Sequence, residues 1–283
     1  MEIISGKEIS KEILNNIKSE VSSRGIVPGL AVVLVGQDKA SHIYVDLKEK
    51  AAKEVGIRFD KFLFDENDSE DLILDKIKEL NRDDRIHGII VQLPLPGKFD
   101  TQKIINAISP KKDVDGFHPD NIEAFFENRS DFMPVFPSAI VKMVKASLEG
   151  NFSDKEAIVI ANSDRFGGVM CSALNREGVE SKYVFCSDVL REKPSGSLIE
   201  ELREADVIVT ACGVLNLIDS SMVKDSVVVI DGGIVKKDGK VFGDAKFNSF
   251  EGTNCKVSPV PGGVGPMTVA CLLENVYLMS VSE

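Results

Sequence analysis

Short runs of β-branched and other apolar residues recur along the chain, separated by segments with the periodicity of amphipathic helices. The apolar runs cover residues 30–35, 57–64, 88–91, 157–161, 182–186, 206–211 and 226–231. Strands that alternate with helices form parallel sheets in which a crossover helix joins successive strands. The pattern therefore predicts an α/β chain with two doubly wound domains that join near residues 134–150.

The intervening segments carry the signals that start and stop helices. Ser5 and Glu8 have capping-box spacing, and an apolar stripe follows them until Gly25. An apolar helix is also predicted to close the chain and to run to Met279. Further helices are predicted at residues 40–55, 69–80, 137–148, 167–175 and 197–204.

The composition argues against several classes of protein. With a formal net charge of −11 and no basic block, the chain is a poor candidate for binding nucleic acid or an anionic membrane. The five cysteines are odd in number, lack a CxxC pair and are accompanied by only three histidines, so we expect no metal site and a reducing, cytoplasmic location. We identify neither a signal peptide nor an apolar run near the ~20 residues that span a bilayer.

The carboxyl ends of parallel strands are where such sheets bind ligands. Residues 36–41 follow the first predicted strand and residues 92–96 follow the third, so we expect the two loops to meet at one edge. The first loop leads into a helix that carries Tyr44 and Lys48 one turn apart on the same face. Taken alone, such a pair is common on exposed helix faces.

Two further loops have unusual compositions. Residues 110–118 (PKKDVDGFH) contain two carboxylates, a glycine and a histidine, and this loop alone is best interpreted as a solvated turn. Residues 258–268 (SPVPGGVGPMT) hold three prolines and three glycines just before the last helix. Because glycine lets a backbone approach a ligand closely, we interpret the second loop as a ligand contact.

Four segments in this order resemble the methylenetetrahydrofolate dehydrogenase/methenyltetrahydrofolate cyclohydrolase family: residues 35–57 (VGQDKASHIYVDLKEKAAKEVGI), 88–96 (GIIVQLPLP), 111–118 (KKDVDGFH) and 258–268. The resemblance covers nearly the whole chain. It implies oxidation of 5,10-methylenetetrahydrofolate to the methenyl form with NADP, and hydrolysis of the methenyl form to 10-formyltetrahydrofolate. Both reactions belong to the one-carbon metabolism that serves purine biosynthesis.

The resemblance also implies a domain arrangement and a homodimer. Residues 1–136 and 268–283 are expected to form the folate-binding catalytic domain, with the last helix packed back on it. Residues 137–267 are expected to form a Rossmann-type NAD(P)-binding domain.

The resemblance places the folate site on four residues. It implies that Lys48 is the central catalytic group, that Gln92 contacts and tunes this lysine, that the Tyr44 ring stacks on the folate, and that Asp115 grips the pterin. A carboxylate suits that ring because the 2-amino group and the adjacent N–H offer two parallel donors. Further substrate contacts are implied for Ser41, Leu93, Pro261, Gly262 and Gly263.

The cofactor half departs from the family pattern. The contacts that the resemblance implies are Ala161, Asn162, Ser163, Ser187, Ile234 and Gly265. The family usually has Gly-Arg-Ser where this chain has Ala161-Asn162-Ser163, and the arginine pairs with the 2′-phosphate of NADP. A histidine usual after the next strand is replaced by Cys186.

Three alternatives for the cofactor therefore stay open. The enzyme uses NADP with Arg165 or Lys182 supplying the missing charge, or it prefers NAD because Asp188 bonds the ribose, or it binds the dinucleotide weakly and is mainly a cyclohydrolase.

Two other classes of protein share features with this sequence. Short-chain dehydrogenases also carry a Tyr-x-x-x-Lys pair, but there the pair follows the dinucleotide-binding strands, whereas here it precedes them by more than a hundred residues. A non-catalytic folate or nucleotide binder does not need a lysine that transfers protons. The presence of Lys48 and Gln92 therefore favours an enzyme.

Overall fold

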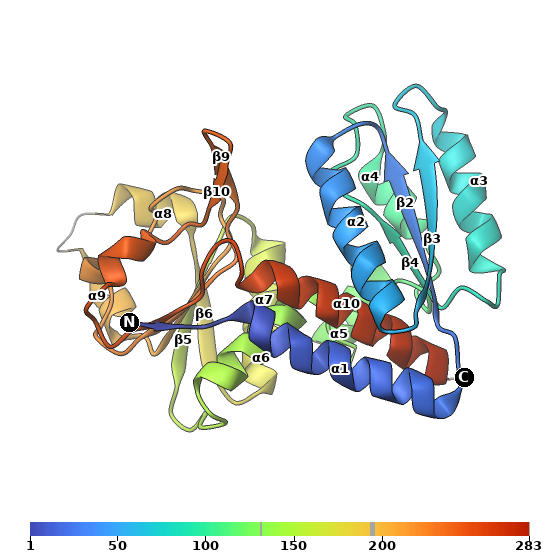
Figure 1. Ribbon diagram of the computed structural model, residues 1–283. Helices are drawn as coiled ribbons and strands as arrows, with labels where there is room; N and C mark the ends of the chain where they lie inside the picture. Colours follow the sequence, from blue (N-terminus) through green and yellow to red (C-terminus); the bar gives the residue numbers. More distant parts are fainter. Residues whose placement is uncertain (131, 193–195, 283) are drawn as a thin grey trace. The chain divides into compact units, whose positions relative to one another are not determined.

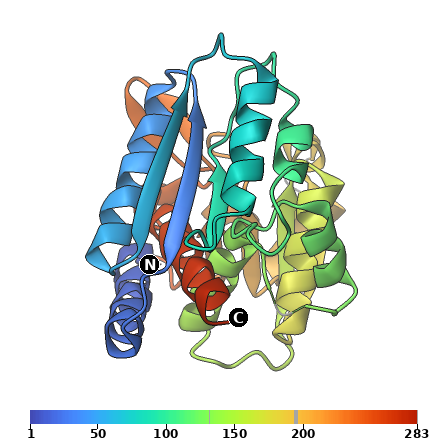
Figure 2. The same ribbon diagram turned by 90° about the vertical axis from the view of Figure 1, so that its right-hand side faces the viewer.

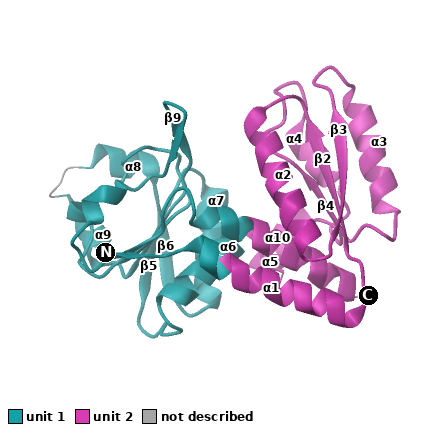
Figure 3. Cartoon of the chain, in the orientation of Figure 1, with its two compact units in different colours: residues 1–9, 136–268 teal, residues 10–135, 269–283 magenta. Residues whose placement is uncertain are grey.

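The computed structural model describes residues 1–130, 132–192 and 196–282, and the chain divides into two compact units. Unit 1 comprises Met1–Ile9 and Phe136–Thr268, and unit 2 comprises Ser10–Val135 and Val269–Glu283 (Figure 3). Each unit contains its own parallel sheet and is described by itself.

Unit 2 is built on three parallel strands in the order β3-β2-β4. These strands are β2 (Gly29–Val35), β3 (Arg58–Phe64) and β4 (Gly88–Val91). Helices α2 (Lys39–Glu54) and α3 (Glu70–Asn81) lie on opposite sides of the sheet (Figures 1 and 2). The unit also holds most of α1 (Gly6–Arg24), together with α4 (Thr101–Asn106) and α5 (Pro119–Phe126).

The central strand β2 is buried on both faces, which explains its continuous apolar sequence. Its alternate residues Ala31, Val33 and Val35 belong to one buried cluster with residues of α3 and α4. Polar caps fix where the flanking helices begin. The Ser69 hydroxyl, for example, accepts a hydrogen bond from the Leu72 amide at the start of α3.

Unit 1 contains a six-stranded sheet in which every pairing is parallel, in the order β1-β11-β8-β7-β5-β6. Its strands are β1 (Glu2–Ile3), β5 (Glu156–Ala161), β6 (Glu180–Phe185), β7 (Val207–Thr210), β8 (Val228–Asp231) and β11 (Lys256–Val257). The chain leaves β5 toward β6 on one side and returns to β7 on the other. The carboxyl ends of β5 and β7 therefore flank a topological switch point, where doubly wound sheets bind nucleotides.

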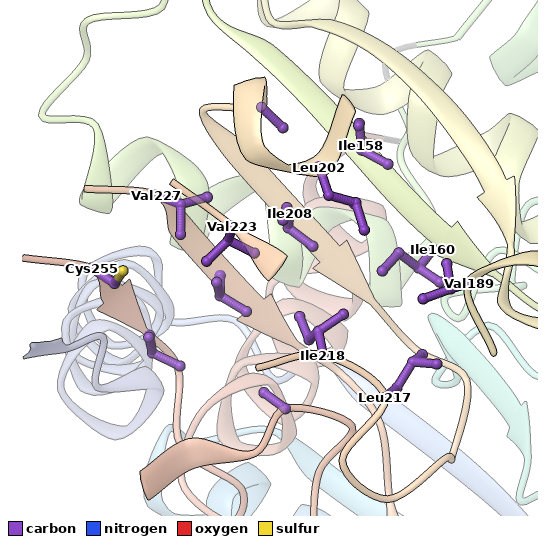
Figure 4. Close-up of a cluster of buried hydrophobic side chains, with 14 of the residues drawn as sticks. Ile158, Ile160, Val189, Leu202, Ile208, Leu217, Ile218, Val223, Val227 and Cys255 are labelled. Atoms are coloured by element: carbon purple, nitrogen blue, oxygen red, sulfur yellow. The ribbon is translucent and has the colours of Figure 1, made fainter. Parts of the chain in front are cut away.

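Helices and a buried cluster complete unit 1. Its helices are α6 (Val135–Ser147), α7 (Asp164–Arg176), α8 (Cys186–Arg191) and α9 (Ser197–Glu204), with 3₁₀ turns at Ser220–Met222 and Phe247–Phe250 and a hairpin of β9 (Val235–Lys237) and β10 (Lys240–Phe242). Figure 4 shows the apolar side chains of β5, β7 and α9 meeting in the core. The alternation seen in the sequence thus produces the predicted α/β fold with two parallel sheets.

The first nine residues, predicted to lie in the catalytic domain, pack with unit 1. They belong to unit 1 because β1 pairs in parallel with β11, with Glu2 opposite Lys256 and Ile3 opposite Val257. The Lys7 amide also donates to the Gly262 carbonyl over 3.2 Å. A two-residue strand has no periodicity, so the sequence could not reveal this pairing.

Helix α10 (Val264–Val281) contradicts the expectation that no apolar run approaches the length of a membrane span, because by length and composition alone it meets that criterion. From Val269 onward it belongs to unit 2, as predicted for the last helix. There Asn275 Nδ2 donates to the Val114 carbonyl over 2.9 Å, and the Tyr277 hydroxyl donates to Glu20 over 2.9 Å. Burial of Ala270, Cys271, Leu272, Leu273 and Val276 accounts for the apolar composition of this part.

Candidate active site

The turn from β2 into α2 fixes the start of the helix that carries Tyr44 and Lys48. Asp38 caps this helix, because its Oδ2 accepts hydrogen bonds from the backbone amide and the hydroxyl of Ser41, each over 2.8 Å. Ser41 is buried. Its hydroxyl, predicted to contact substrate, therefore lies in the cap that positions the helix.

Lys48 contacts a side chain from the loop after β4. Its Nζ donates a hydrogen bond to Gln92 Oε1 over 2.9 Å. The side-chain amide of Gln92 is oriented by a second hydrogen bond, in which Nε2 donates to the Leu93 carbonyl over 2.8 Å. The backbone amide of Gln92 donates to the Val33 carbonyl over 2.9 Å. The structure therefore brings the loops after β2 and β4 together, as predicted from strand order.

Asp115 interacts electrostatically with Lys48. Burial lowers the pKa of Lys48, and the nearby charge of Asp115 opposes that shift. Burial also raises the pKa of Asp115 to about 6, while Lys48 lowers it and Asp113 raises it. Each partner thus favours the other's charged form, but removal from water dominates for both.

Asp113 holds the Asp115 loop in place, a role that the sequence analysis missed. Its buried carboxylate accepts hydrogen bonds from the amides of Gly116 (3.1 Å) and His118 (2.8 Å) and from Asn121 Nδ2 (2.9 Å). The loop is thus an ordered turn, and the interpretation as a merely solvated one is wrong. Gly116 has φ +83°, and a Cβ there would lie 2.7 Å from the Pro134 Cα, so only glycine fits without strain.

The remaining predicted folate residues fall in both units. Tyr44 lies one turn before Lys48 on α2 and is partly buried. Pro261, Gly262 and Gly263 form the turn before α10 in unit 1. A Cβ on Gly263 would lie 2.7 Å from the Pro259 carbonyl oxygen, so this turn needs glycine for its own packing.

The predicted cofactor residues lie mainly at the carboxyl edge of the unit 1 sheet. Ala161 ends β5 and is buried, whereas Asn162 is exposed. Ser163 caps α7 by accepting from the Phe166 amide over 3.3 Å. Farther along, a Cβ on Gly167 would lie 2.5 Å from the Tyr183 ring. This glycine therefore permits the close helix–strand packing that dinucleotide-binding folds require, and the amino end of α7 suits a phosphate.

Three other predicted contacts follow strands or begin helices. Ser187 is exposed in the first turn of α8, which begins at Cys186 rather than leaving that residue in the strand as predicted. Ile234 is 48% exposed between β8 and β9, and Gly265 lies in the first turn of α10 with open space where a Cβ would be.

Fold and site together define an enzyme class. One unit has the switch point of a dinucleotide-binding sheet, and the other holds a desolvated lysine against a glutamine and a carboxylate. No group of three or more metal-ligating side chains occurs within the described residues. The parallel sheet with its switch point and the desolvated lysine are typical of an NAD(P)-dependent enzyme.

Comparison with known proteins identifies the family. Residues 4–115 match the catalytic domain of tetrahydrofolate dehydrogenase/cyclohydrolase, and residues 134–283 match its NAD(P)-binding domain. The chain belongs to the tetrahydrofolate dehydrogenase/cyclohydrolase family, which confirms the resemblance drawn from the four sequence segments. It is an enzyme of the class that oxidises methylenetetrahydrofolate and hydrolyses methenyltetrahydrofolate.

Individual relatives agree over almost their full lengths. The chain is 40% identical over 279 residues to bifunctional protein FolD of Pelagibacter ubique, which covers 97% of this chain and 96% of the relative. The crystal structure of the bifunctional FolD from Campylobacter jejuni has a TM-score of 0.89 at 38% identity, covering 99% of this chain and 98% of that chain. The Trypanosoma brucei FolD, solved with NADP cofactor and an inhibitor, has a TM-score of 0.89 at 28% identity, covering 98% and 96%.

Proposed function

We propose that Lys48 carries the proton transfers of the cyclohydrolase reaction. The single observation that supports this role most is the contact of its Nζ with Gln92 in a site whose burial lowers the pKa of Lys48. A lysine that gives up its proton more readily than usual can accept a proton from the water that attacks the methenyl carbon. As the bond from that carbon to N5 breaks, the resulting ammonium can return a proton to N5, while the hydroxyl on the carbon loses its proton to solvent and becomes the carbonyl of the formyl group on N10.

Asp115 and Tyr44 are proposed to hold the folate while this happens. An ionised Asp115 can accept two parallel hydrogen bonds from the pterin, and its negative charge offsets that of the cationic methenyl group. Gln92 keeps the Lys48 amine directed, because its own amide is fixed by Leu93. Tyr44, one turn earlier on α2, offers a ring for stacking.

The dinucleotide is proposed to bind at the switch point of unit 1, with a phosphate at the amino end of α7. When bound, its nicotinamide accepts the hydride from the methylene carbon. Ala161, Asn162 and Ser163 would hold it beyond β5, Ser187 beyond β6 and Ile234 beyond β8. The backbone of the loop before α10, together with Gly265, is proposed to approach the dinucleotide closely.

NADP is the proposed acceptor, with Arg165 supplying the charge that Asn162 lacks. Of the two cations predicted for this task, Lys182 lies in the middle of β6, opposite Ile158 of β5. Arg165 is exposed in the first turn of α7, three residues after Asn162. The T. brucei relative solved with NADP supports the same cofactor. Asp188, the basis of the NAD alternative, lies exposed within the first turn of α8, beyond the end of β6.

Cofactor preference is tested by oxidising methylenetetrahydrofolate with each dinucleotide. We expect kcat/KM to be at least ~10-fold higher with NADP, since a charge-assisted contact to the 2′-phosphate contributes about 1.5–3 kcal/mol. Arg165→Ala should remove most of this preference and leave the NAD reaction within about twofold, whereas Lys182→Ala should leave the preference in place.

The alternatives predict different outcomes in the same assay. A preference for NAD would reject NADP as the acceptor and favour the Asp188 alternative. Turnover with neither dinucleotide would indicate an enzyme that is mainly a cyclohydrolase.

A homodimer in the cytoplasm is proposed for the working enzyme. The support for the dimer is the family's usual assembly. The support for the location is that all five cysteines are free thiols, as proteins in a reducing compartment usually have.

A further inference from the structure

Unit 1 contains two buried carboxylates, one at the last residue of a strand and one just after another strand. The proposed reaction uses neither of them. Asp231 ends β8 and is 2% exposed. Its Oδ1 accepts hydrogen bonds from the amides of Gly233 (2.9 Å) and Asp244 (3.0 Å), and its Oδ2 accepts one from Ala245 (2.8 Å). Asp231 therefore joins the turn after β8 to the segment after β10.

Asp244 extends this connection to β7. It is fully buried, and its Oδ2 accepts from the Thr210 hydroxyl over 2.7 Å and from the Cys212 amide over 2.6 Å. Its Oδ1 accepts from the Val214 amide over 2.7 Å. Through these three hydrogen bonds, the Asp244 carboxylate holds the end of β7 and the loop that follows it at the switch point.

The connection continues at both ends. The Asp231 amide donates to the Ser258 hydroxyl just after β11 over 2.7 Å, and Cys212 Sγ donates to the Ile160 carbonyl in β5 over 3.3 Å. One chain of hydrogen bonds therefore links the carboxyl ends of β11, β8, β7 and β5. These four strands are consecutive in the sheet.

Two glycines show how tightly the carboxylates are enclosed. A Cβ on Gly233 would lie 2.1 Å from Asp244 Oδ1, and one on Gly243 would lie 2.0 Å from Asp231 Oδ2. Any side chain at either position would displace a carboxylate. The backbone next to Ile234 is therefore fixed by the same contacts.

This arrangement costs free energy that an apolar cluster would not. Neither carboxylate forms an ion pair with any described residue, and replacing buried charges by apolar groups is often stabilising. Burial raises the pKa of Asp231 to about 6. The hydrogen bonds that Asp231 accepts lower this pKa, and the negative charge of Asp244 raises it further. Six donors directed at two carboxylates fix loop geometry more sharply than apolar packing does.

We propose that Asp231 and Asp244 are positioning residues for the dehydrogenase reaction, holding the loops after β7 and β8 in the conformation that binds the dinucleotide. This inference rests on the proposed function, because it assumes that the dinucleotide occupies this edge of the sheet. A loop already fixed in its binding conformation avoids the cost of ordering on association. Loss of the carboxylate contacts should therefore weaken dinucleotide binding while leaving the hydride transfer of the bound complex nearly unchanged.

Thr210 provides a matched pair of variants. It is fully buried and donates its hydroxyl to Asp244. Thr210→Val keeps the volume and removes the donor, whereas Thr210→Ser keeps the donor and removes a methyl group. A positioning role predicts that Val raises the KM for the dinucleotide about 5- to 10-fold with kcat within about twofold, and that Ser leaves KM near wild type.

Asp244→Asn is the larger perturbation, because one amide N–H₂ must then face a backbone N–H. We expect the dinucleotide KM to rise about 10- to 100-fold. Hydrolysis of methenyltetrahydrofolate without dinucleotide, for which the proposed proton-transfer residue Lys48 lies in unit 2, should stay within about twofold and serves as the folding control. If Asp244→Asn does not fold, the Thr210 pair still decides the question.

The outcomes separate this inference from the function on which it rests. Direct titrations of the wild type with NADPH and with NADH, followed by nucleotide fluorescence, first show whether a dinucleotide binds. A wild type that binds neither would overturn the proposed dinucleotide site and this inference with it. A wild type that binds, together with a Thr210→Val variant of unchanged KM, or with equal losses in the Val and Ser variants, would overturn the positioning role alone.

Discussion

Lys48→Met should lose about 10²- to 10⁴-fold of the rate of methenyltetrahydrofolate hydrolysis, the contribution typical of one group that transfers protons. Methionine matches the length and apolar stem of lysine, so the packing of α2 against β2 and β3 should be retained. The measurement is the fall in methenyl absorbance in the presence of enzyme, after subtraction of the hydrolysis in enzyme-free buffer.

Two further lysine variants make this result specific. Lys50→Met removes an exposed lysine from the same helix and should keep hydrolysis within about twofold. Lys48→Arg keeps a positive charge but cannot release its proton near neutral pH, so it should be as inactive as Lys48→Met. An active Lys48→Arg enzyme would show that Lys48 acts through its charge and not through proton transfer.

Asp115→Asn should lower kcat/KM for folate substrates about 10²-fold, because one acceptor of a paired, charge-assisted contact becomes a donor facing a donor. Both activities should fall, since both use the same bound folate. A variant that loses hydrolysis but keeps dehydrogenase activity would contradict the assignment of Asp115 to substrate binding.

The pH dependence of kcat/KM gives this variant a second readout. The pKa of Asp115 in the free enzyme is raised to about 6, so the wild-type value should fall as the pH drops below about 6 and the carboxylate is protonated. This acidic limb should be absent from Asp115→Asn.

The same shift works against stability. The carboxyl group of Asp115 has a pKa of about 6 in the folded protein. In an unfolded chain the pKa of an aspartate is ~3.9. Between these values the folded state holds more protons, so the contribution of Asp115 to stability improves as the pH falls and is least favourable above 6. Asp115→Asn should therefore be at least as stable as wild type at pH 7.5. Thermal unfolding of the variant checks this, and an unchanged midpoint would exclude unfolding as the cause of lost activity.

The sequence was sufficient to predict the sheets and the meeting of Lys48 with Gln92. Strand–helix alternation is a local signal, and parallel strands place their carboxyl ends at one edge, so Lys48 and Gln92 could be expected to meet. The family resemblance then singled out Asp115, whose loop composition alone had indicated only a solvated turn.

Features that depend on long-range pairing were not predictable in the same way. Glu2 and Ile3 have no strand pattern, yet they extend the sheet of unit 1 because β11 offers them a free edge. Asp113 holds backbone amides in place, and nothing in the sequence distinguishes such a carboxylate from one that contacts a ligand.

The central claim is that the hydrolytic centre is a half-buried lysine whose amine is easier to deprotonate than an exposed one. It is tested most directly by titrating protein labelled with ¹³C at lysine Cε and following the signals by NMR, with Lys48→Met used to assign the Lys48 signal. We predict that one signal titrates clearly below all the others and is missing from the variant. A Lys48 signal that titrates together with the exposed lysines would contradict this account of the site.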